Sequence, residues 1–182
     1  GLNLVSGIEV GHGGVWVGAA PEFLFIPKDD ADKAGTPVVL LDGWGFHDTH
    51  ETLNSFVWGP DGWLYGCNGT IFDVEVGAPG TPKARRVRMN RGIWRYHPKH
   101  KKFEIFAEGT SNPWGMDWDE HGEMFFINTV IGHLWHGIQG AHFKRMHGED
   151  PYEHIYGLID QHADHYHWDK TGGEQWSDTK KA

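Results

Sequence analysis

The stretch NSFVWGPDGWLYG (Asn54–Gly66) decides the fold, because its pattern occurs three times in the chain. A short apolar strand leads into a turn that ends in glycine, and a strongly β-forming strand follows. The other copies are SGIEVGHGGVWVG (Ser6–Gly18) and WGMDWDEHGEMFFI (Trp114–Ile127). Glycine adopts positive φ without steric cost, which suits tight hairpin turns. Self-similarity at a spacing of roughly 40–60 residues indicates a solenoid or a propeller.

Two more strands follow each of the first two hairpins. The third strand ends in proline, as in EFLFIP (Glu22–Pro27) and GIWRYHP (Gly92–Pro98). The fourth ends in glycine, as in PVVLLDG (Pro37–Gly43) and KFEIFAEG (Lys102–Gly109). Four strands in each unit form the blade of a β-propeller. The sequence therefore predicts an all-β chain that holds about two and a half four-stranded blades of a six-bladed propeller.

The predicted blades divide the chain into three parts. Blade one covers about 6–43 and blade two about 53–109, while a partial blade three with a long loop covers about 111–182. Blade three has HLWHGI (His133–Ile138) as its third strand and continues into a His-rich segment, helical or irregular, with a helix expected over Tyr152–Ile159. Because propellers usually close with about four to eight blades, we expect a fragment of one propeller domain.

Composition limits the function classes. The net charge of −9 and the pI near 5.8 argue against a protein that binds nucleic-acid backbones. No apolar run approaches the ~18 residues of a transmembrane helix, so none is expected. The single cysteine, Cys67, excludes an internal disulfide, a zinc ribbon and a haem attachment motif within these residues. Ten Trp and ten Phe suit sheet faces and surfaces that stack on sugars.

The loop Phe46–Glu51 (FHDTHE) joins blades one and two and carries the first candidate site. In a propeller, the loop that enters the innermost strand opens beside the central channel. His50 lies four residues before the strand that starts at Asn54, and its near-neutral pKa suits a general base. Asp48 and Glu51 are close enough in sequence to orient or polarise it. The alternative is a loop of solvated polar residues.

The equivalent loop before blade three, Gly109–Pro113 (GTSNP), should place Ser111 and Asn112 at the same channel. Its alternative interpretation is an ordinary turn, since Ser-Asn-Pro forms turns readily. Blade two also contains a long excursion over residues 72–89, in which Arg85 and Arg86 could clamp an anionic group. A solvated basic turn is the alternative for these arginines.

The His-rich segment offers a candidate metal site. Its residues are His162, Asp164, His165 and His167. Two His and a carboxylate suffice as the inner shell of a transition metal. The segment lacks a fixed zinc motif such as HExxH, however, and a polar channel rim is the alternative interpretation.

Three long motifs carry a family resemblance. THETLNSFVWGPDGWLYGCNG (Thr49–Gly69), GIWRYHP and GTSNPWGMDWDEHGEMF (Gly109–Phe125) resemble the soluble quinoprotein glucose/sorbosone dehydrogenase superfamily. They are more closely similar to the propeller domain of the membrane-bound dehydrogenase family of large secreted bacterial proteins. The resemblance extends from Gly1 to about Trp168.

The resemblance implies a dehydrogenase that oxidises a sugar or polyol hydroxyl in the periplasm or outside the cell. His50 would take the hydroxyl proton while hydride leaves the same carbon, and the electrons would pass to a quinone or haem acceptor. Pyrroloquinoline quinone and calcium are the implied cofactors, and a cytochrome c domain of the same full-length protein is the implied partner. The alternative is a non-catalytic propeller that binds carbohydrate or a protein partner.

The chain departs from the family at two positions. Ser111 stands where the family has an arginine that contacts the quinone, and serine cannot supply a cationic fork. The stretch over 127–131 corresponds to the one that holds calcium in the family, and it contains no carboxylate. The candidate cofactor residues are Ser111 and Asn112, which occupy the family's positions, and Arg85 and Arg86, which could replace the missing arginine.

Overall fold

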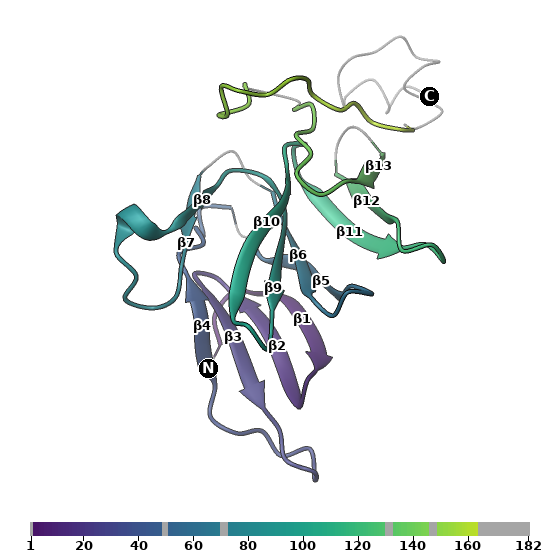
Figure 1. Ribbon diagram of the computed structural model, residues 1–182. Helices are drawn as coiled ribbons and strands as arrows, with labels where there is room; N and C mark the ends of the chain where they lie inside the picture. The colour runs from purple at the N-terminus through teal and green to yellow at the C-terminus, as the bar shows by residue number, and fades with distance from the viewer. Residues whose placement is uncertain (1, 49–50, 70–72, 130–132, 146–148, 164–182) are drawn as a thin grey trace, which may run out of the picture.

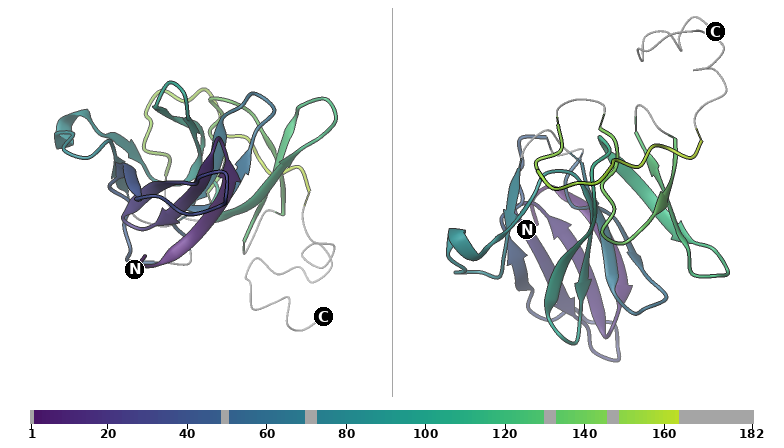
Figure 2. Two further views of the ribbon diagram at one scale, coloured as in Figure 1. Left: turned by 90° about the horizontal axis from the view of Figure 1, so that it is seen from below. Right: turned by 45° about the horizontal axis from the view of Figure 1, so that its top comes forward.

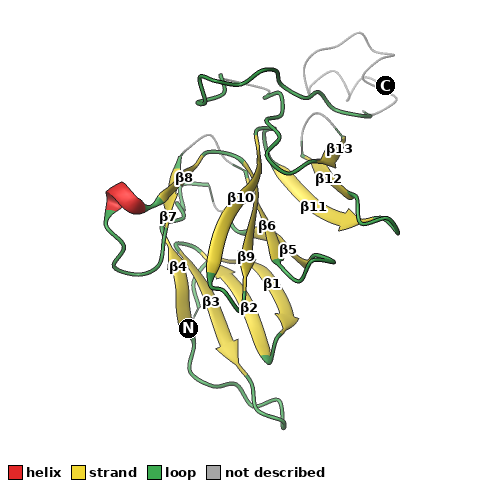
Figure 3. Cartoon of the chain, in the orientation of Figure 1, coloured by secondary structure: helices red, strands yellow, loops and turns green. Residues whose placement is uncertain are grey.

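The computed structural model describes residues 2–48, 51–69, 73–129, 133–145 and 149–163. Within these residues the chain forms thirteen β-strands and one short 3-10 helix, η1 (Lys83–Arg85) (Figures 1 and 3). The strands are β1 (Val5–Gly11), β2 (Gly14–Ala19), β3 (Glu22–Pro27), β4 (Val38–Asp42), β5 (Asn54–Trp58), β6 (Leu64–Asn68), β7 (Val74–Val76), β8 (Val87–Met89), β9 (Gly92–His97), β10 (Lys102–Glu108), β11 (Pro113–Trp118), β12 (Met124–Asn128) and β13 (Leu134–Gly137).

The strands pair into antiparallel sheets that match the predicted blades. The first sheet has the order β1-β2-β3-β4 and the second β5-β6-β9-β10. The third contains β11-β12-β13, and β7 and β8 form a separate hairpin within the long excursion of the second unit. The structure therefore confirms the prediction of an all-β, partial propeller with four-stranded blades.

The repeated glycine turns form as the sequence indicates. Gly62 and Gly122 close the β5–β6 and β11–β12 turns with φ of +80° and +82°. Their amide groups donate to Gly59 O at 3.0 Å and Asp119 O at 3.1 Å. Positive φ at these positions explains why glycine recurs at the end of each turn.

Strands β1, β5 and β11 bring neighbouring sheets together as the innermost strands of blades do (Figure 2). Trp58 Nε1 donates to Val10 O across β5 and β1 at 2.9 Å. Gly115 N donates to Ser55 Oγ across β11 and β5 at 2.7 Å. These contacts align the ends of the three sheets, and we call the end where β1, β5 and β11 begin the top end.

Aromatic side chains fill the space between the first and second sheets. The core there includes Trp16, Phe23, Trp44, Phe56, Trp94 and Tyr96, all buried. A second core, which includes Tyr65, Phe106, Phe126 and Trp135, lies between the second and third sheets. Burial of this aromatic area is the main favourable term that holds blade against blade.

Gly66 in β6 shows how closely these layers pack. A Cβ at this position would lie 2.2 Å from Trp94 Cζ2. We expect Gly66→Ala to lower the unfolding free energy by about 1–3 kcal/mol, because the indole must shift within a filled core. Denaturant unfolding measures the change. Gly157→Ala is the control, since a Cβ at Gly157 meets no atom within 4 Å; equal losses in the two variants would contradict the packing.

The prediction of a helix over Tyr152–Ile159 is wrong. The segment runs through turns and bends, and Ile159 joins Phe143 in a parallel bridge. Lys144 N donates to Ile159 O at 2.9 Å, and Ile159 N donates to His142 O at the same distance. These long-range bonds, with Gly157 inside the segment, outweigh the weak local preference for a helix. No helix in the described part of the chain is long and apolar enough to cross a membrane.

Candidate functional site

Buried polar side chains gather at the top end of the second and third sheets. Among the described residues, the polar or charged ones that are buried as whole residues are Thr52, Asn54, Asn68, Arg91, Thr110 and Asn128. Each lies at a strand end or within two residues of one, on β5, β6, β9, β10 or β12. Antiparallel pairing brings the starts of β5 and β9 to the same edge as the ends of β6, β10 and β12. The chain thus places a polar cluster above the aromatic cores. We call these six residues, together with Asn112 directly before β11, the top-end cluster.

Hydrogen bonds to backbone atoms fix part of this cluster. The carbonyl of Glu51 accepts from Asn54 Nδ2 at 3.0 Å and from Gly69 N at 2.8 Å. Asn68 Nδ2 donates to Asn90 O at 3.1 Å. These bonds hold the chain before β5 against the end of β6 and the start of β9.

Three oxygen atoms of the site have no partner. Asn54 Oδ1, Thr110 Oγ1 and Asn112 Oδ1 are buried and accept no hydrogen bond from any described residue. A Cβ at Gly69 would lie 2.3 Å from Asn112 Oδ1, so the glycine lets this amide approach the end of β6. An unsatisfied buried polar group costs about 1–3 kcal/mol, and such groups in native structures commonly mark a water or ligand position.

Thr110 is also held in a strained backbone conformation. Its φ is +62°, in the left-handed region that a β-branched residue rarely adopts. Strain of this kind costs about 1–3 kcal/mol and clusters at functional sites. The strained backbone and the unpaired hydroxyl therefore occur at the same residue.

Arg91 supplies positive charge beside Thr110. Its Nη1 lies 3.5 Å from Thr110 O, and the side chain is buried at the start of β9. Burial lowers the pKa of Arg91, and the neighbouring charge of Arg145 lowers it further, whereas Glu51 acts in the opposite direction. The top-end cluster thus combines unpaired hydrogen-bond acceptors with a buried cation.

The predicted catalytic residues are only partly placed. His50 lies outside the described residues. Asp48 is exposed, and Glu51 is half-buried with its carbonyl in the top-end cluster. Ser111 and Asn112 are both half-buried next to Thr110. Asn112 N donates to Asn128 Oδ1 at 2.6 Å, which fixes the start of β11 against the end of β12.

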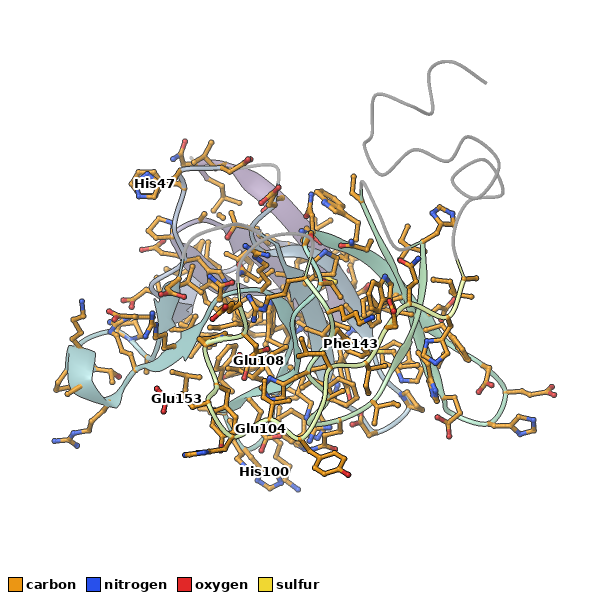
Figure 4. The ribbon with its side chains drawn as sticks, turned by 90° about the horizontal axis from the view of Figure 1, so that it is seen from above. His47, His100, Glu104, Glu108, Phe143 and Glu153 are labelled. Carbon is orange, nitrogen blue, oxygen red and sulfur yellow. The ribbon has the colours of Figure 1, made fainter. Side chains whose placement is uncertain are left out.

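The predicted arginines lie on the outer hairpin instead. Arg85 is exposed on η1. Arg86 forms an ion pair with Asp42 and donates to Thr81 O at 3.0 Å. These bonds tie the hairpin to the end of β4. The view from above shows His47, which lines a surface hollow with Arg86, far from Glu108 at the end of β10 (Figure 4).

Of the four predicted metal ligands, only His162 lies within the described residues. His162 faces His136, with ring centroids 5.9 Å apart, and its Nδ1 accepts from His136 N at 3.3 Å. Asp164, His165 and His167 lie outside the described residues. No group of three His, Cys, Asp or Glu side chains suitable for a metal occurs among the residues that the structure describes.

Sequence reasoning missed most of the top-end cluster. Asn54, Asn68 and Asn128 lie at the ends of apolar strands. An Asn at such a position is typical of any strand end and does not by itself indicate a site. Arg91 stands alone between two turn residues, without a motif. Once strand order is known, the recurrence of Asn at the same edge of β5, β6 and β12 is the signal that could have found them.

Comparisons with known proteins give one family match. The family described as "Domain of unknown function (DUF7133)" matches residues 1–168. No curated protein sequence matches the chain. Among solved structures, the PQQ-bound form of Aldose Sugar Dehydrogenase (Adh) from Streptomyces coelicolor is similar over 90% of this chain and 68% of that chain, with 14% identity and a TM-score of 0.40. That similarity is too distant to carry an argument about activity.

Proposed function

The chain belongs to the family described as Domain of unknown function (DUF7133), and we propose that it binds a sugar or polyol at the top-end cluster and oxidises one of its hydroxyl groups. The observation that carries the proposal is the set of three buried oxygens without hydrogen-bond donors. The resemblance of the sequence motifs to sugar dehydrogenases points to the same substrate class.

A polyhydroxylated ligand matches the chemistry of these atoms. Asn54 Oδ1, Thr110 Oγ1 and Asn112 Oδ1 each require a donor. A sugar or polyol presents several O–H donors at short spacing, and each hydroxyl can also accept from a donor such as Arg91. Binding would therefore relieve the cost of the unpaired groups, which favours this class over an apolar ligand.

His50 is the proposed general base of the reaction. It immediately precedes Glu51, whose carbonyl lies within the top-end cluster. In the proposed step the imidazole takes the hydroxyl proton, and hydride leaves the same carbon for a bound or soluble two-electron acceptor. The reaction would take place in the periplasm or outside the cell.

The residues expected to hold a quinone and calcium do not form a fitting site in the described chain. The quinone of the resembling family is an anion, yet Ser111 and Asn112 bring no cation, and Arg86 is occupied by Asp42. The three unpaired oxygens require hydrogen-bond donors, whereas the ionised carboxylate groups of the quinone are acceptors only. Of the stretch expected to hold calcium, the described residues Ile127, Asn128 and Thr129 contain no carboxylate.

This disagreement favours a second candidate, a propeller that binds carbohydrate without oxidising it. The two candidates share the same ligand and differ only in chemistry. Calorimetric titration with glucose and sorbitol, combined with reduction of a redox dye, separates them. Binding with dye reduction supports the dehydrogenase, binding alone supports the recognition module, and absence of binding contradicts both.

Thr110→Val tests the site with almost no change of shape. We expect polyol binding to weaken by about 2- to 10-fold, because one hydrogen bond to the ligand is lost. We also expect the unfolding free energy of the free protein to stay constant or rise by about 1 kcal/mol, since the variant removes an unsatisfied hydroxyl.

Calorimetry and denaturant unfolding measure these two quantities for Thr110→Val. Thr36→Val, at an exposed position outside the top-end cluster, is the matched control and should change neither binding nor stability. A Thr110→Val variant that binds as well as the wild type, or that loses stability, would contradict a ligand role for this hydroxyl.

A further inference from the structure

Arg145 carries a buried charge that forms an ion pair with Asp150 but is only partly hydrogen-bonded. Its side chain is only 3% exposed, and Nη1 donates to the amide oxygen of Asn90. Its Nε and Nη2 donate to no acceptor in the described part of the chain. A guanidinium stays protonated at any ordinary pH, and a buried charge without strong acceptors is costly. The arrangement therefore leaves two N–H donors of the guanidinium without an acceptor among the described residues.

The unpaired atoms are the two that a carboxylate prefers. Nε and Nη2 form the side-on edge of the guanidinium, with two roughly parallel N–H bonds. A carboxylate accepts both bonds in a bidentate pair, which is stronger and more specific than a single contact. On Arg145 this edge is free of hydrogen bonds among the described residues, while the opposite nitrogen is anchored to Asn90.

The acidic residues nearby do not complete this edge. Asp150 Oδ2 lies 3.5 Å from Arg145 Nη2, near enough for charge attraction but without a hydrogen bond. Its oxygens have other partners, because Oδ1 accepts from Tyr152 N at 2.9 Å and Oδ2 contacts His142 Nδ1 at 3.1 Å. Glu108 also faces Arg145; burial raises the pKa of its carboxyl, whereas the charges of His142 and Arg145 lower it.

Arg91 adds a second cation beside the first. Arg145 interacts with Arg91 strongly enough to help lower the pKa of its guanidinium, while Glu51 is the acidic group that faces Arg91. Arg91 also contacts Thr110 O, so it lies beside the residue with the unpaired hydroxyl. Arg91 therefore links Arg145 to Thr110, one of the residues proposed to bind ligand hydroxyls.

We propose that the side-on edge of Arg145, with Arg91 beside it, binds the carboxylate of an acidic sugar such as a uronate. The proposal rests on the proposed function, which places the hydroxyls of the same ligand at Asn54, Thr110 and Asn112. The preferred substrate would then be an acidic sugar rather than a neutral one.

Calorimetric titration of the purified protein with glucuronate and with glucose tests the proposal. The wild type should bind glucuronate at least about tenfold more tightly, as expected for a charge-assisted pair. Arg145→Gln should remove this preference and leave glucose affinity within about twofold. Arg145→Lys keeps the charge but loses the fork, so most of the preference should also disappear. Lys99→Gln, which removes one exposed charge from the β9–β10 turn, should change neither affinity.

The outcomes separate the two claims. Equal affinity of the wild type for both sugars would overturn the carboxylate site and leave the proposed function intact, whereas no binding of either sugar would overturn both. Pyrroloquinoline quinone, which carries carboxylates of its own, is titrated in parallel. If Arg145→Gln weakens quinone binding but not glucuronate binding, the acidic-sugar proposal fails. Thermal unfolding checks that each variant folds. If Arg145→Gln does not fold, Arg145→Lys is compared with the wild type instead.

Discussion

Trp94→Ala is expected to lower the unfolding free energy by about 3–5 kcal/mol, more than any surface substitution in this protein. Trp94 is fully buried at the centre of the core between the first two sheets. Its ring centroid lies 5.4 Å from that of Phe56 and 5.5 Å from that of Phe23, both edge-to-face. The substitution removes these contacts and leaves a cavity that the rigid sheets cannot fill by collapsing.

Denaturant unfolding monitored by circular dichroism measures this loss. Phe46→Ala is the aromatic control, because Phe46 is 57% exposed and its removal should cost less than about 1 kcal/mol. If Trp94→Ala were no more destabilising than Phe46→Ala, the two sheets would not be held together by this core. A variant that fails to express folded protein while Phe46→Ala folds normally agrees with the prediction.

His50→Ala is expected to reduce the rate of sugar-dependent dye reduction by about 10²- to 10⁴-fold. A positioned base removes the hydroxyl proton as hydride leaves, and alanine offers no group that can take its place. Sugar affinity should change little, because the three unpaired oxygens proposed to bind the hydroxyls remain. The measurement is the initial rate at saturating sugar across a range of pH, with calorimetry for affinity.

His100→Ala is the matched control for His50→Ala. His100 is exposed in the β9–β10 turn, at the opposite end of the sheet from the top-end cluster. Its removal should leave the rate and its pH dependence unchanged. Equal rates for His50→Ala and the wild type would exclude His50 as the base. If the two His variants lost activity equally, the effect would not be specific to the site.

The sheets could be predicted from the sequence because their signals are local. In Asn54–Gly66 and Trp114–Ile127, the alternating strands and the turn glycine all lie within about fourteen residues. Glycine with positive φ closes these turns wherever they occur. The third strand of the last sheet, β13, lies within the predicted strand His133–Ile138.

The site was less predictable because it depends on contacts between distant segments. Thr110 appears in the sequence as part of a turn, and only packing against Arg91 reveals its buried hydroxyl. Arg145 follows no motif, and its environment is built from Asn90 and Asp150. The segment before Ile159 was expected to be helical because its bridge to Phe143 cannot be read from local sequence.

The central claim is that polyol hydroxyls bind at the unpaired oxygens of the top-end cluster. The most direct test follows the ¹⁵N-labelled side-chain amides of Asn54 and Asn112 by NMR while sorbitol or glucuronate is added. We predict that both amide signals shift and saturate with one common dissociation constant, while the exposed Asn3 does not respond. Binding that leaves Asn54 and Asn112 unshifted would contradict the claim and move the ligand to another part of the protein.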